Sequence, residues 1–136
     1  MGPDDAREFV TSNHRAVLIT RRASGRLQTS PVLVGVDSEG KLVISTREAA
    51  YKTRNLRRDP TAVLCVFADG FFGSWMQIEG TAQVVPLPKA MDGLIDYYRR
   101  ISGEHPDWDD YRRAMRQQQR VLLRVSIEKV GPSRAG

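Results

Sequence analysis

Short runs of apolar and β-branched residues, separated by turn-forming segments, constrain the fold of this chain more than any other feature. The first three runs are joined only by RASGR and DSEG, which are too short for a crossover helix, so they are expected to pair as antiparallel hairpins. No run is followed by Gly-x-Gly-x-x-Gly and a helix, which argues against a dinucleotide-binding βαβ fold. The six predicted strands are residues 16–20, 28–36, 41–46, 61–68, 74–85 and 120–130.

Three residues modify these strands and turns. Pro31 lies inside the second run and lacks an N–H group, so this run is predicted to be an edge strand or to contain a bulge. Gly80 interrupts the long fifth run and predicts a bulge or bend there. Gly25 is the residue of the first turn best suited to a left-handed backbone conformation.

Helical patterns occupy the segments between the later strands. Residues 48–58 favour a helix that Asp59-Pro60 ends, and two amphipathic helices precede the last strand. The chain is therefore predicted to be a mainly β (α+β) protein, a single domain over residues 1–136, with an antiparallel barrel and helices on its outside. The predicted helices are residues 4–13, 48–58, 88–102 and 106–119.

Composition excludes several other classes of protein. With 136 residues, 40% hydrophobic and 27% charged, the chain is long enough for one core and is not disordered. No apolar run approaches ~20 residues, and the acidic start MGPDDAREFV does not resemble a signal peptide. The single cysteine, Cys65, excludes an internal disulfide framework. The expected location is the cytoplasm.

The positive charge is concentrated in one segment. The net charge is +5, and residues 41–60 alone hold six basic residues against two acidic ones. Such a cluster predicts an anionic partner, which is a phosphorylated small molecule, a nucleic acid or an anionic membrane. An ordinary solvated basic surface would have the same composition, so charge alone does not decide between these alternatives.

A phosphate site is the most specific chemistry in this segment. Ser45 and Thr46 end a strand, and a helix begins shortly after them, so hydroxyl groups, a lysine and helix N–H groups come together. Helical spacing places Lys52 and Asn55 on one side of this helix and Arg54 on another. Periodicity alone slightly favours an ordinary charged surface helix. The candidate helix residues are Lys52, Thr53, Arg54 and Asn55.

Other catalytic and binding chemistries have little support. His14 and His105 are isolated and are expected to be structural, and two distant histidines do not form a metal site. Cys65 lies in an apolar strand and is expected to be an unreactive thiol. The second arginine cluster, in residues 112–116, follows three aspartates, so neither nucleic acid nor a membrane is an expected partner. An enzyme with so few proton-transfer groups would depend on a bound cofactor, and no residue is assigned as a catalytic acid or base.

The segments STREAAYKTRNLRRDP (45–60), IEGTAQ (78–83) and YRRISGEHPDWDDYRRAM (98–115) resemble the pyridoxamine 5′-phosphate oxidase-like split β-barrel family. They are most similar to its actinobacterial branch, which uses the deazaflavin coenzyme F-420. The resemblance implies a six-stranded antiparallel split β-barrel with peripheral helices. It also implies a homodimer with cofactor grooves at the dimer interface.

The resemblance also implies a set of cofactor-binding residues. Lys52 occupies the position of the family's phosphate-binding lysine, and the end of the preceding strand lines the same groove. The second strand would run beside the deazaflavin ring, with Pro31 where several relatives have Asn. Trp75 and Met76 would approach the ring from the partner subunit. The complete set is Gln28, Thr29, Ser30, Pro31, Val32, Ser45, Thr46, Lys52, Thr53, Arg54, Asn55, Trp75 and Met76.

The expected function is hydride transfer between reduced coenzyme F-420 and a small organic electron acceptor. An extended row of cations suits this polyanionic coenzyme better than the single phosphate of flavin mononucleotide (FMN). Three alternatives remain: an FMN-dependent enzyme of the pyridoxamine-phosphate oxidase type, a non-catalytic flavin- or deazaflavin-binding protein, and a nucleic-acid-binding module. The cationic row consists of Lys52, Arg54, Arg57 and Arg58.

Overall fold

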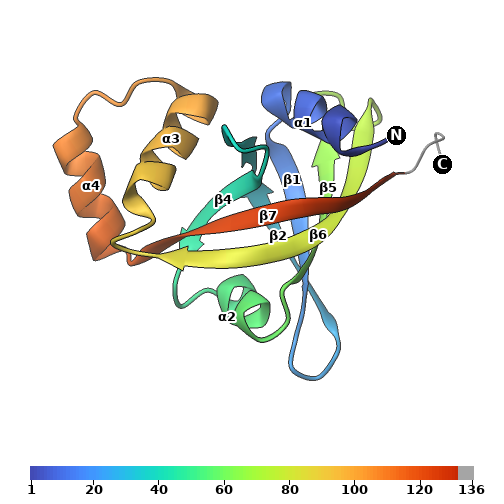
Figure 1. The fold of residues 1–136 in the computed structure, drawn as a ribbon, viewed down its shortest axis with the longest axis horizontal. Coiled ribbons are helices and arrows are strands. Elements are labelled where there is room, and N and C mark those ends of the chain that lie inside the picture. The colour runs from blue at the N-terminus through green and yellow to red at the C-terminus, as the bar shows by residue number, and fades with distance from the viewer. Residues whose placement is uncertain (132–136) are drawn as a thin grey trace.

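The computed structural model describes residues 1–131 and shows one antiparallel sheet that curls into a half-barrel, with four helices around it (Figure 1). The strand order is β2-β1-β5-β6-β7-β4-β3. The strands are β1 (Arg15–Arg21), β2 (Leu27–Leu33), β3 (Gly35–Val36), β4 (Leu42–Arg47), β5 (Thr61–Phe67), β6 (Trp75–Pro86) and β7 (Arg120–Gly131). The helices are α1 (Pro3–Ser12), α2 (Tyr51–Arg58), α3 (Met91–Ser102) and α4 (Trp108–Gln117).

The prediction of six strands was wrong by one, because the run 28–36 forms two strands on opposite edges of the sheet. β2 pairs with β1, whereas β3 pairs with β4. Val34 separates them; its side chain is fully buried, and its N–H donates to the carbonyl of His14 at 2.8 Å. This break lets one continuous segment join both edges, which makes the sheet a split barrel. The edge position predicted from Pro31 is confirmed.

The main core fills the barrel and is closed by helices at two places. Leu18, Ile44 and Leu64 are among its fully buried side chains. Val10 of α1 and Leu56 of α2 join the same cluster from outside the sheet. α1 packs on β3 and β7, and α2 packs on β1 and β6, so both contribute an apolar face to the barrel interior (Figure 1).

A second apolar cluster holds α3 and α4 against the outside of β4, β6 and β7. Leu94 and Tyr111 from the two helices pack with Val43 of β4 and Leu122 of β7. Gly93 allows α3 to approach closely, because a Cβ atom there would lie 2.6 Å from the side chain of Leu122. The amphipathic pattern of both predicted helices is therefore confirmed by their packing.

The two glycines singled out in the sequence have the predicted roles. The β6–β7 register shifts between Glu79 and Gly80, where a Cβ atom would collide with the carbonyl oxygen of Ser126. Gly25 has a φ of +88°, in the left-handed region. The bulge therefore depends on the missing side chain of Gly80.

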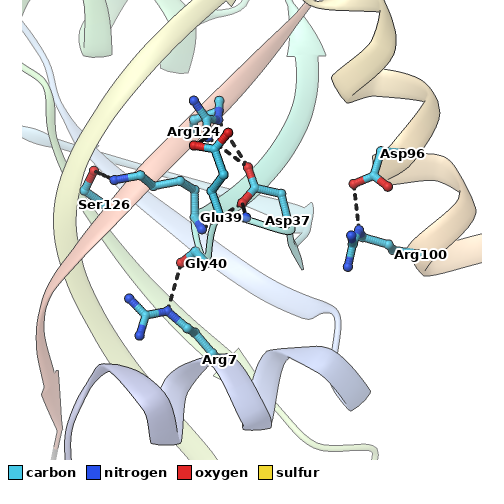
Figure 2. A network of polar contacts seen from close by, with 9 residues as sticks. Arg7, Asp37, Glu39, Gly40, Asp96, Arg100, Arg124 and Ser126 are labelled. Atoms are coloured by element: carbon cyan, nitrogen blue, oxygen red, sulfur yellow. Dashed lines mark hydrogen bonds and ion pairs between the residues drawn. The ribbon is translucent and has the colours of Figure 1, made fainter.

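A polar network connects α1, the turn between β3 and β4, and β7 (Figure 2). Arg7 Nε donates to the carbonyl of Gly40 at 3.0 Å. Arg124 Nη2 lies 3.1 Å from the Asp37 carboxylate and 3.2 Å from that of Glu39. These contacts hold the turn beside the barrel. They give a structural role to several charged residues for which the sequence predicted none.

Candidate functional site

The split in the barrel forms a cleft of about 560 Å³ between β2 and β4, which we call the split cleft. The helices α3 and α4 form its other wall. Tyr97 of α3 donates a hydrogen bond from its hydroxyl to the carbonyl of Leu33 at 2.8 Å, and so connects this wall to β2. The cleft is lined by Pro31, Val32, Leu33, Ser45, Thr46, Lys52, Tyr97, Tyr98, Tyr111, Met115, Gln118 and Arg120.

The N-terminus of α2 lies at the cationic end of the split cleft. Thr53 donates from its hydroxyl to the carbonyl of Arg47 at 2.6 Å, which holds the turn between β4 and α2. The N-cap residue is Ala50, which has no capping side chain. Within residues 1–131, the N–H groups of residues 51–53 have no backbone acceptor. Free N–H groups and the helix dipole make this end suitable for an anion.

The cations at this end of the cleft repel one another. Burial lowers the pKa of Lys52, and the nearby charge of Arg120 lowers it further. Burial and the charge of Arg47 likewise lower the pKa of Arg120, whose Nε donates to Gln118 Oε1 at 2.8 Å. In the described part of the chain, neither Lys52 nor Arg120 has an ion-pair partner. An anion bound here would therefore relieve an existing repulsion.

Three tyrosines form the aromatic wall of the split cleft. Burial is the main cause that raises the pKa of Tyr97, and it raises that of Tyr111 to about 12. Tyr111 also donates to the carbonyl of Leu94 at 2.8 Å, and its ring lies 5.2 Å from that of Tyr98. The wall thus presents aromatic surface to the cleft, which suits a flat conjugated ligand.

The structure divides the predicted site residues between two clefts. Five of them line the split cleft, and three line a second cleft of about 500 Å³ on the other side of α2, which we call the arginine cleft. Helical spacing predicted Asn55 on the side of Lys52, and this was wrong, because Asn55 lies with Arg54. The arginine cleft is lined by Arg22, Ala23, Gln28, Tyr51, Arg54, Asn55 and Arg58.

Asn55 is committed to hydrogen bonds inside the protein. Its Nδ2 lies 3.1 Å from Thr20 Oγ1 and 3.2 Å from Gln28 Oε1, and its Oδ1 accepts from Arg58 Nη2 at 3.1 Å. The side chain is 6% exposed. Asn55 therefore shapes the floor of the arginine cleft and orients Arg58 there.

The remaining predicted residues lie outside both clefts of their own chain. Thr29 is exposed and Ser30 is half-buried on β2. Trp75 is 39% exposed and Met76 is buried in the main core, both at the end of β6 farthest from α2. Their predicted contact with a cofactor depends on a partner subunit.

The α3–α4 wall and Arg120 are part of the cleft, although they are absent from the predicted set of site residues. The wall consists of Tyr97, Tyr98, Tyr111 and Met115, which lie in the two predicted amphipathic helices, and Arg120 begins the last predicted strand. No local pattern distinguishes them, since the barrel brings them to Lys52 from positions more than 40 residues away.

The other candidate groups have structural partners. His14 Nδ1 lies 2.9 Å from the carbonyl of Val34, and the backbone N–H of Asp107 donates to His105 Nδ1 at 2.9 Å. Burial raises the pKa of Cys65, which disfavours its thiolate. In residues 1–131, no three His, Cys, Asp or Glu side chains are grouped to hold a metal ion. No helix of these residues is both long and apolar enough to span a membrane.

An antiparallel sheet whose edges are joined through Val34, with a cleft along the split, defines a split β-barrel protein. The chain belongs to the pyridoxamine 5′-phosphate oxidase family, whose sequence profile matches residues 3–133. This family includes flavin-binding oxidoreductases.

Solved structures share this fold at low sequence identity. A conserved hypothetical protein from Mycobacterium tuberculosis has a TM-score of 0.76 and 22% identity over 96% of this chain and 82% of its own. An F-420 reductase has a TM-score of 0.68 and 20% identity over 92% and 94% of the two chains. A heme-binding protein from Mycobacterium smegmatis has a TM-score of 0.71 and 17% identity over 97% and 55%.

Proposed function

We propose that this protein is a coenzyme F-420-dependent oxidoreductase that transfers hydride between the reduced coenzyme and a small organic electron acceptor. The observation that carries the proposal is the pair of cationic clefts on the two sides of α2. FMN has a single phosphate, which the split cleft alone could bind. The deazaflavin coenzyme has a phosphodiester and a polyglutamate tail, so its anionic groups could occupy both clefts. The solved F-420 reductase with the same fold is consistent with this assignment.

The residues of the split cleft fit the phosphate and ring of such a coenzyme. Lys52 and the free N–H groups of α2 would bind the phosphate, and the hydroxyls of Ser45 and Thr46 lie in the same cleft. β2 on one side and the tyrosine wall on the other would orient a flat ring and exclude water. When bound, the coenzyme supplies the hydride. The protein contributes position and electrostatics rather than an acid or base of its own.

We further propose that the active form is a homodimer. Val17, Pro31 and Cys65 lie side by side on the outer face of β2, β1 and β5, and Leu33 there is 47% exposed. The helices pack on β3, β4 and β7 and on parts of β1 and β6, so they leave this apolar face open. The face meets the split cleft at Pro31 and Leu33. A second copy on this face would give the cleft a further wall.

The basic surplus does not favour nucleic acid, because several arginines are already paired. Arg57 Nη2 lies 2.7 Å from Glu48, and two arginines of α4 pair with aspartates one turn earlier. We therefore expect only weak, salt-sensitive association with DNA. The proposal places the protein in the cytoplasm, in agreement with its single half-buried cysteine.

Fluorescence titration with coenzyme F-420 and with FMN tests the cofactor assignment. We expect tighter binding of F-420, followed by oxidation of the reduced coenzyme when a quinone-type acceptor is added. Arg54→Gln removes a cation of the arginine cleft and is expected to weaken F-420 binding about two- to fivefold without changing FMN affinity. Arg57→Gln is the matched control on the same helix, because Arg57 is paired with Glu48.

The FMN-dependent enzyme and the non-catalytic binding protein each have their own result in this experiment. Tighter binding of FMN, or an equal effect of Arg54→Gln on both cofactors, would assign the protein to the FMN-dependent enzymes. Binding of F-420 without reduction of any acceptor would favour a non-catalytic binding protein.

A further inference from the structure

A third cleft, of about 540 Å³, has no role in the proposed hydride transfer. Most of its lining residues come from the end of β6, the start of α3, the end of α4 and the start of β7. These four ends lie close together in Figure 1. We call it the apolar cleft, because five of its nine lining residues are apolar. Its volume is within the ~300–1,000 Å³ of small-molecule sites. It is lined by Glu48, Pro86, Leu87, Pro88, Met91, Arg116, Gln119, Arg120 and Val121.

Three charged residues line the apolar cleft, Glu48, Arg116 and Arg120. Arg116 is exposed on α4 and has no ion-pair partner within residues 1–131. Arg120 uses its Nε for Gln118, which leaves its terminal nitrogens without an ion-pair partner in the described chain. Glu48 is bound by Arg57 at 2.7 and 2.9 Å through both carboxylate oxygens. Two guanidinium groups therefore line the cleft together with apolar residues, and the carboxylate is already neutralised by Arg57.

The charge balance of this lining decides the class of ligand. Because Arg57 neutralises Glu48, the two arginines give the cleft two uncompensated positive charges. A carboxylate matches the planar shape of a guanidinium group, and its two oxygens offer an acceptor to each arginine. A neutral apolar molecule would leave both arginines without an anionic partner. The apolar body of such a ligand would contact Leu87, Met91 and Val121.

We propose that the apolar cleft binds an amphipathic organic monoanion, a carboxylate with an aliphatic body, held by Arg116 and Arg120. Arg120 also lines the split cleft, whereas the other eight lining residues belong to the apolar cleft and not to the split cleft. The inference goes beyond the proposed function and does not depend on which cofactor the split cleft binds.

Isothermal titration calorimetry of the full chain with decanoate, at sub-micellar concentration and without cofactor, tests the proposal. We expect saturable one-to-one binding and much weaker binding of decanol, which has the same body without the charge. Arg116→Gln is expected to weaken decanoate binding about tenfold, the effect of losing a hydrogen bond to a charged group. Arg113→Gln is the matched control on α4, because Arg113 pairs with Asp110 at 3.2 Å outside the cleft.

Two further variants locate the bound decanoate. Met91→Trp fills the apolar cleft and should abolish binding, with circular dichroism confirming that the variant is folded. Lys52→Gln alters only the split cleft and should leave decanoate affinity unchanged. Absence of binding, equal binding of decanol, or loss of binding in Lys52→Gln but not in Arg116→Gln would overturn the proposal.

Discussion

Lys52, Thr53 and Arg54 are consecutive in α2, yet their side chains have three different environments. Lys52 lines the split cleft, Thr53 is fully buried and bonded to Arg47, and Arg54 lines the arginine cleft. Each residue of an α-helix is rotated by about 100° from the one before it, so consecutive side chains meet different neighbours. The function of this segment therefore depends on which part of the barrel each side chain meets.

Lys52→Met is expected to weaken cofactor binding without lowering the thermal stability of the cofactor-free protein. Burial and Arg120 lower the pKa of Lys52 from its ordinary value of 10.5, so below the lowered pKa the folded state carries the cost of burying this charge. That cost disappears as pH rises through the lowered pKa toward the ordinary one. Removing the charge should therefore leave the melting temperature of the cofactor-free protein unchanged or higher at neutral pH, with a smaller difference at alkaline pH.

The same substitution should weaken cofactor binding by roughly 1.5–3 kcal/mol, the usual contribution of a hydrogen bond to a charged group. Differential scanning fluorimetry across pH measures the stability, and fluorescence titration measures the dissociation constant. Arg57→Met serves as control, since Arg57 is paired with Glu48 on the same helix. An unchanged dissociation constant would remove Lys52 from the site.

At the scale of elements, α2 is positioned by a buried amide rather than by apolar contact alone. Asn55 of α2 reaches Thr20 on β1 and Gln28 on β2, so one side chain connects three elements. Asn55→Ala should lower the free energy of unfolding by about 1–3 kcal/mol, because it leaves the 2%-exposed Thr20 hydroxyl without this donor. Urea denaturation measures the change. Gln83→Ala, on the exposed face of β6, should have almost no effect, and equal losses in the two variants would contradict this role.

The β6–β7 bulge gives a second prediction at this scale. Gly80→Ala places a methyl group against the carbonyl of Ser126, so the two strands must separate locally. We expect a loss of about 1–3 kcal/mol in unfolding free energy, as for other overpacked sites. Gly70→Ala is the control, because the nearest atom to a Cβ there is 3.9 Å away. Equal thermal stability of the two variants would show that the bulge adapts without cost.

At the scale of the whole molecule, the open outer face of β2, β1 and β5 determines the expected assembly. Val17→Lys places a charge in the middle of this apolar face and should convert the dimer to a monomer. Light scattering coupled to size-exclusion chromatography measures the mass, with Gln83→Lys as a control outside the face. A monomeric wild-type protein at micromolar concentration would contradict the homodimer.

Much of this fold follows from local patterns in the sequence. Alternating apolar residues place the strands, Pro31 marks an edge because it cannot donate a ladder hydrogen bond, and Gly80 marks a bulge. The amphipathic pattern of residues 106–119 predicts one buried face on α4, and Tyr111 and Met115 are buried there. These features depend on residues within one or two turns of each other, so the chain itself contains the information.

Only the tertiary structure decided which distant residues share a cleft. Val34 breaks the predicted strand 28–36 because the barrel closes there, and the local pattern did not place the break at this residue. Asn55 faces Thr20 rather than Lys52, and Arg120 reaches Lys52 from the start of β7, because sheet pairing fixes these neighbours. Local sequence therefore determined the elements and the cationic segment of the site. The closure of the barrel determined the aromatic wall, the division into clefts and the charges left unpaired, since each needs contacts between residues far apart in the chain.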